Sequence, residues 1–125
     1  MKFFPDTSFL CALYREQANS RQARTCYAKL PECLGISPAV LFEFRQSARL
    51  QVFLNTQDHR KGFRLQEADK MLAAMQSDLD CGAATVLPID WSAVLLIAER
   101  ISTAHTRHCG NRSWDVLHVA TALHL

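Results

Sequence analysis

The sequence lacks the features that mark secreted and membrane-spanning proteins. Its 5 cysteines are an odd number and include no Cys-x-x-Cys pair, which argues against a disulfide framework and for reduced thiols. No apolar run approaches the roughly 20 residues that a membrane-spanning helix needs, and the N-terminus lacks the apolar core of a signal peptide. We therefore expect a soluble, cytoplasmic protein that makes no use of a membrane.

The sequence also has few glycines and only a small net charge. Only 4 of the 125 residues are glycine, and the first turn contains no glycine-rich phosphate loop, which argues against a nucleotide-binding fold. The formal net charge of +2 permits an anionic partner but falls short of the strongly basic balance of dedicated nucleic-acid binders. The densest basic stretch suits either phosphate contact or an ordinary solvated helix face, and it contains Arg45, Arg49, Arg60, Lys61 and Arg64.

What the chain does have is enough apolar residues for one core. At 125 residues and 49% hydrophobic composition it lies in the usual range of single domains. No internal repeat, low-complexity segment or linker suggests a second domain. We therefore predict one domain over residues 1–125.

Short apolar segments alternate with helical periodicity along the chain. Residues 2–5, 33–37 and 84–89 are the expected strands, and each is followed by a helical pattern. The central helix has a clear start, with Ser37 as the N-cap and Pro38 at the first helical position. This alternation predicts an α/β fold with a mostly parallel sheet covered by helices on both faces.

Three acidic residues stand in otherwise apolar settings. Asp6 follows the first apolar segment, Glu43 lies in Ser-Pro-Ala-Val-Leu-Phe-Glu-Phe, and Asp115 lies in Arg-Ser-Trp-Asp-Val-Leu-His-Val. Like-charged carboxylates that are held together repel, so such a cluster needs hydrogen bonds, protonation or a divalent cation to compensate. The simplest compensation is Mg²⁺ or Mn²⁺.

Other polar residues have simpler interpretations. Asp90 follows the third strand and has the position and residue type of a helix N-cap. His118 lies one helical turn after Asp115, where it could orient that carboxylate or pack in the core. Each of the hydroxyls of Thr7 and Ser8 has two equally good interpretations: it contacts a ligand, or it caps the N-terminus of the first helix.

The three acidic motifs, taken together and in this order, resemble those of the PIN-domain ribonucleases. They are Phe-Phe-Pro-Asp6-Thr-Ser, Ile-Ser-Pro-Ala-Val-Leu-Phe-Glu43-Phe and Arg-Ser-Trp-Asp115-Val-Leu-His-Val-Ala-Thr-Ala-Leu. The resemblance covers nearly the whole chain and is closest to the VapC-type toxins of bacterial toxin-antitoxin pairs. It implies a three-layer PIN-like fold and a metal-dependent endoribonuclease that cuts RNA and is restrained by an antitoxin.

The resemblance also implies roles for the acids. By position, Asp6, Glu43 and Asp115 would be the catalytic, metal-binding residues. They would hold one or two Mg²⁺ or Mn²⁺ ions, which bind a phosphate oxygen and lower the pKa of a bound water.

The chain departs from the family pattern after the third acid. PIN domains continue into another strand, with a Thr-x-Asp-like motif that supplies a fourth acid, and this sequence stops at Leu125. The resemblance therefore predicts that the last strand is missing, that activity is reduced, and that an open strand edge lets two copies form a homodimer. The alternative is a catalytically inert PIN-like module that binds an antitoxin or itself.

Overall fold

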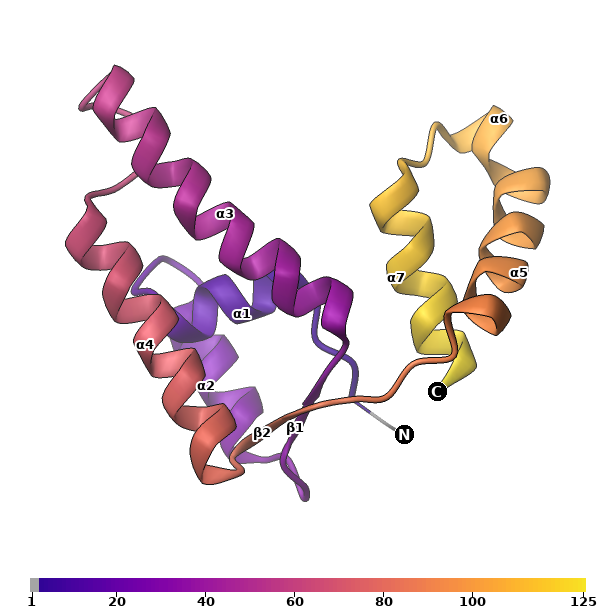
Figure 1. Ribbon diagram of the computed structural model, residues 1–125, viewed down its shortest axis with the longest axis horizontal. Coiled ribbons are helices and arrows are strands. Elements are labelled where there is room, and N and C mark those ends of the chain that lie inside the picture. Colours follow the sequence, from indigo (N-terminus) through magenta and orange to yellow (C-terminus); the bar gives the residue numbers. More distant parts are fainter. Residues whose placement is uncertain (1–2) are drawn as a thin grey trace. The chain divides into compact units, whose positions relative to one another are not determined.

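The structure is a computed structural model that describes residues 3–125, and its contacts divide the chain into two compact units. The first unit ends at Val86 and the second is Leu87–Leu125. The first unit contains α1 (Thr7–Tyr14), α2 (Ser20–Ala28), β1 (Leu34–Ile36), α3 (Pro38–Gln57), α4 (Leu65–Cys81) and β2 (Ala84–Val86) (Figure 1). The second contains α5 (Trp91–Ile101), the π-helical turn η1 (Ser102–Thr106), α6 (Arg107–Cys109) and α7 (Ser113–His124). In the described part of the chain, no helix combines the length and the apolar character needed to cross a membrane.

The sheet of the first unit is small and parallel. β1 pairs with β2 in the register Leu34 with Ala84, Gly35 with Thr85 and Ile36 with Val86. Parallel strands need a long crossover, and α3 and α4 supply it between β1 and β2. The predicted α/β class is thus confirmed, as a mostly helical fold with a small parallel sheet.

The strand predicted over residues 2–5 is wrong in its described part. Phe3, Phe4 and Pro5 pair with no other strand, and Lys2 lies outside the described residues. Proline has no N–H to donate to a ladder, and the segment is held by side chains instead: Pro5 is buried, and the ring of Phe3 packs edge-on against Phe9 at 5.0 Å. The sequence pattern identified an apolar segment correctly but assigned it the wrong backbone pairing.

The helix starts that the sequence predicted are present. Ser37 Oγ accepts a hydrogen bond from the backbone N–H of Val40 at 3.1 Å, and Pro38 is the first residue of α3. Asp90 Oδ1 accepts one from the N–H of Ala93 at 3.1 Å, which confirms Asp90 as the N-cap of α5. In each cap, a side-chain oxygen accepts a hydrogen bond from one of the N–H groups that have no backbone partner at the start of a helix.

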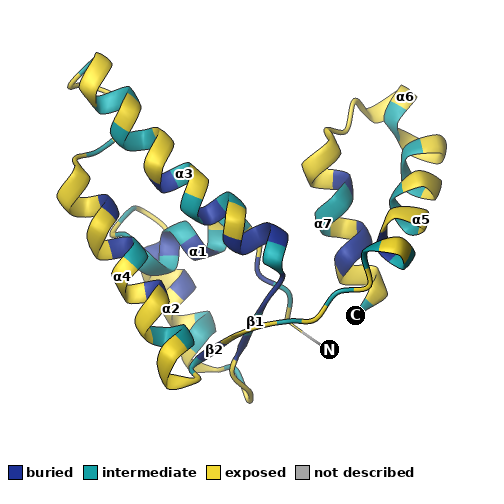
Figure 2. Ribbon diagram, viewed as in Figure 1, coloured by how far each residue is buried: buried dark blue, intermediate teal, exposed yellow. Residues whose placement is uncertain are grey.

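The core of the first unit is formed where α1, β1, α3 and α4 meet. Figure 2 shows buried residues on the inward sides of these elements. Leu10, Ile36, Phe44 and Met75 are completely buried there. A side-chain hydrogen bond also links α1 to α4 in this unit: the hydroxyl of Tyr14 on α1 donates to a carboxylate of α4 at 2.6 Å.

The second unit is a pair of helices, α5 and α7, that pack against each other. The residues they bury are Val94, Val116, Ala120 and Thr121. Several larger apolar side chains remain exposed, among them Leu95, Leu96, Trp114, Val119 and Leu123. The described part of this unit therefore buries far less apolar volume than the first.

Candidate functional site

Asp6 is held in place by the start of α1. Its backbone is extended, and its Oδ1 accepts a hydrogen bond from the N–H of Phe9 at 2.8 Å, so Asp6 itself is the N-cap. Of the two roles considered for Thr7 and Ser8, N-capping is thus taken by Asp6 instead; an aspartate carboxylate is at least as good a cap as either hydroxyl. Within residues 3–125 the second carboxylate oxygen of Asp6 makes no hydrogen bond, so the cap leaves it able to contact a ligand.

Glu43 lies on α3, facing the same region of the first unit. It is half-buried and shares one face of the helix with Ser47 and Gln51, which follow at intervals of four residues. α1, which Asp6 caps, packs against α3. Burial raises the pKa of Cys11 on α1, a hydrogen bond to Ser47 lowers it, and the charges of Asp6 and Glu43 raise it by smaller amounts. The two acids therefore belong to packed elements of the same unit.

Asp115 belongs to the other unit. It is an exposed residue in the first turn of α7, and the ring of His118, one turn later, lies 5.8 Å from that of Trp114. Among the described residues, no three or more His, Cys, Asp or Glu side chains form a group that could hold a metal ion. The shared three-acid site of Asp6, Glu43 and Asp115 therefore stays a prediction.

The two acids of the first unit carry oxygen donors of the kind that a hard divalent cation takes. Carboxylate oxygens are the ligands that Mg²⁺ and Mn²⁺ prefer, and Asp6 offers an oxygen that the cap bond leaves open. Glu43 supplies a second carboxylate from a helix whose inner face is buried. A pair of acids on two packed helices is thus a suitable beginning of such a site.

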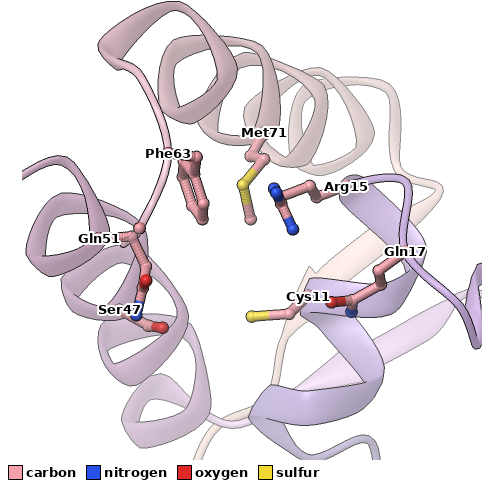
Figure 3. A pocket seen from close by; sticks show the side chains of 8 residues that line it. Cys11, Arg15, Gln17, Ser47, Gln51, Phe63 and Met71 are labelled. Atoms are coloured by element: carbon pink, nitrogen blue, oxygen red, sulfur yellow. The ribbon is translucent and has the colours of Figure 1, made fainter. Parts of the chain in front are cut away.

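A cavity of about 270 Å³ lies in the first unit, between α1, α3 and the loop before α4 (Figure 3). Its polar and charged lining is Cys11, Arg15, Gln17, Ser47 and Gln51, and Phe63 and Met71 supply apolar walls. Cys11 lies on α1, Arg15 directly follows that helix, and Ser47 and Gln51 follow Glu43 at four-residue intervals on α3. The sequence analysis missed this cavity, because its walls come from segments that are far apart in the sequence.

Arg15 occupies one wall of the cavity in a fixed orientation. Its Nε lies 3.2 Å from Glu67 Oε2, and its guanidinium carbon lies 4.5 Å from the centre of the Phe63 ring. The side chain of Arg15 is 33% exposed, so the ion pair with Glu67 is partly shielded from solvent. A carboxylate and an aromatic ring together restrict the plane of the guanidinium.

The loop that carries Phe63 is attached closely to α3. The N–H of Phe63 donates to the carbonyl oxygen of Gln51 at 3.3 Å, and Asn55 Nδ2 donates to the carbonyl oxygen of Lys61 at 2.9 Å. Gly62 has a φ of +59°, and an added Cβ would overlap the carbonyl oxygen of Gln51. Only glycine permits this approach, so the loop wall of the cavity is held rigidly by α3.

A family model described as the PIN domain matches residues 3–125, a span that includes both units. No curated protein matches the chain.

Proposed function

Since this chain belongs to the PIN-domain family, whose members are typically nucleases that use divalent metal ions, we propose that it is an endoribonuclease and the toxin of a VapC-type toxin-antitoxin pair. The observation that carries the proposal is the match of the PIN-domain model to residues 3–125. It is supported by the packing of α1, which Asp6 caps, against α3, which carries Glu43.

The residues of the chain have distinct parts in the proposed reaction. Asp6, Glu43 and Asp115 would hold Mg²⁺ or Mn²⁺ through carboxylate oxygens. When bound, such an ion supplies Lewis acidity and a more acidic bound water for attack on a phosphodiester. Asp6 is oriented by its cap bond to Phe9, and Glu43 is oriented by the buried face of α3.

The proposal also includes the cellular compartment and the binding partners of the protein. All five cysteines are unpaired, as is usual in the reducing cytoplasm, where we place the protein. α3 exposes Phe42, Leu50 and Phe53 at 55%, 47% and 57%, and a row of this kind suits contact with another chain. We propose a cognate antitoxin as one such partner and a second copy of the toxin as another.

Cleavage of labelled structured RNA tests the proposal. Wild-type protein should cut the RNA in Mg²⁺ or Mn²⁺ and not in EDTA, and Asp6→Asn should slow cleavage by about 100-fold or more. Asparagine caps a helix about as well as aspartate, so this variant removes the charge while it keeps the start of α1. The matched control is Asp69→Asn, at an exposed position of α4, which should cleave at the wild-type rate.

Two results would count against the nuclease. Wild-type protein and Asp6→Asn could cleave equally, or both could leave the RNA intact in every metal. If the RNA stays intact while the protein still binds a partner chain, the inert PIN-like module is the better description.

A further inference from the structure

We infer that the cavity between α1, α3 and the loop over residues 58–64 is a pocket for one base of the RNA, next to the site of cleavage. This inference rests on the proposed function, because it assigns a specificity element to the same substrate. The cavity is formed entirely by the first unit. Its volume of about 270 Å³ is close to the lower end of ligand pockets, which begin at roughly 300 Å³, and therefore suits a single planar ring.

The position of the cavity connects it to the acids. Ser47 and Gln51 follow Glu43 by one and two turns on the same face of α3, and Cys11 is one turn after Thr7, the residue that follows Asp6. One turn of an α-helix advances about 5.4 Å, so the cavity begins roughly one turn from the carboxylates. A base next to a phosphate held at those acids can reach a pocket at this spacing.

The walls provide surfaces on which a base can stack. Guanidinium planes and aromatic rings are the groups on which proteins stack unpaired RNA bases. Arg15 lies over the Phe63 ring at 4.5 Å, so a base would stack on an outer side of this pair and not between the two groups. Arg15 is oriented by Glu67, and Phe63 is attached to α3 through its backbone N–H. Because these groups are ordered before any ligand binds, little further ordering would oppose binding.

The remaining polar groups can read the edge of a base. A side-chain amide carries both donors and an acceptor, and Gln pairs in this way with base edges. The amides of Gln17 and Gln51 line the cavity (Figure 3), and within the described residues neither makes a hydrogen bond through its side chain. Two unused amides beside a stacking surface are suited to selecting one base over another.

Binding of short RNA in EDTA tests this pocket without any need for cleavage. The probes are fluorescein-labelled heptamers of adenylate, cytidylate or uridylate, followed by fluorescence anisotropy. Gln51→Ala should lower the ratio between the tightest and weakest heptamer by about fivefold or more, because the amide distinguishes base edges. Phe63→Leu should weaken binding of all three heptamers by about fivefold or more, because the stacking face is lost for every base.

A matched control separates the pocket from general effects on folding. Gln46→Ala makes the same glutamine-to-alanine change at an exposed position of α3 outside the cavity, and it should keep the wild-type affinities and ratio. Thermal unfolding by circular dichroism selects the variants that are folded. If Phe63→Leu does not fold, Gln51→Ala and Gln17→Ala still test the reading of the base edge.

The results distinguish this inference from the proposed nuclease. If Asp6→Asn abolishes cleavage and Gln51→Ala keeps the wild-type heptamer ratio, the base pocket is refuted and the nuclease stands. If the ratio changes as expected but no metal supports cleavage, the pocket is supported and the nuclease is refuted. The pocket is also refuted if wild-type protein binds none of the heptamers, or if the control changes binding as much as the pocket variants.

Discussion

The two units of this chain differ in how much of their own core they supply. In the first unit, side chains from α1, β1, α3 and α4 converge around Phe44, and the cluster includes Leu10, Ile36 and Met75. In the second unit the buried residues are few and mostly small, and Val94 at 0% exposure is the most central of them. Asp6 and Glu43 therefore extend from a well-packed scaffold, whereas Asp115 extends from a sparsely packed one.

The helices of the second unit also leave large apolar side chains uncovered. Leu95, Leu96 and Leu123 are exposed at 58%, 65% and 68%. Contacts that bury these side chains would stabilise α7, and the position of Asp115 therefore depends on them.

Two core substitutions measure the difference between the units. Phe44→Ala should lower the free energy of unfolding by about 3–5 kcal/mol, because it opens a large cavity in a fully buried cluster. Val94→Ala removes less volume from a smaller core and should cost about 1–2 kcal/mol. Urea denaturation followed by circular dichroism gives both values. An equal cost for the two variants would contradict the comparison, because it would mean that the second unit is packed as tightly as the first.

The third acid gives the next largest effect. Asp115→Asn should slow RNA cleavage by about 100-fold, as Asp6→Asn does, if both carboxylates bind the same ion. Asp90→Asn is the matched control in the same unit, because asparagine replaces aspartate as the N-cap of α5 and the residue has no part in the proposed chemistry. The assay is the initial rate in Mn²⁺. A wild-type rate for Asp115→Asn would remove the second unit from the proposed site.

The sequence predicted well those features that depend on neighbours along the chain. The start of α3 at Ser37 and Pro38 and the start of α5 at Asp90 are both set by residues within one helical turn. Each of these residues satisfies a backbone group or fixes a backbone angle locally, so its effect can be read without the fold.

Features that depend on distant partners were harder to predict. The segment that ends at Pro5 looked like a strand, but strand pairing depends on a partner that the local pattern does not identify. The cavity of Arg15 and Phe63 depends on the way a loop after α3 lies against α1, which no single periodicity encodes. For the site, the sequence predicted Asp6, Glu43 and Asp115, and the structure places the first two on packed elements of one unit. Joining Asp115 to them depends on long-range packing, so that part stays a prediction.

The smallest expected effect comes from a pair of glycines that end helices in the two units. Gly82 follows α4 with a φ of +81°, Gly110 follows α6 with a φ of +65°, and an added Cβ would have no atom within 4 Å at either position. Replacement by alanine therefore tests backbone strain alone, which costs about 1 kcal/mol at each site.

Gly82→Ala should lower the free energy of global unfolding by this amount, because α4 is part of the main core. Gly110→Ala should leave global unfolding nearly unchanged and speed hydrogen exchange in α6 and α7, because a sparsely packed unit can open locally. Equal losses of global stability in the two variants would show that the two units unfold together. The units would then differ in how tightly they are packed but not in how cooperatively they unfold.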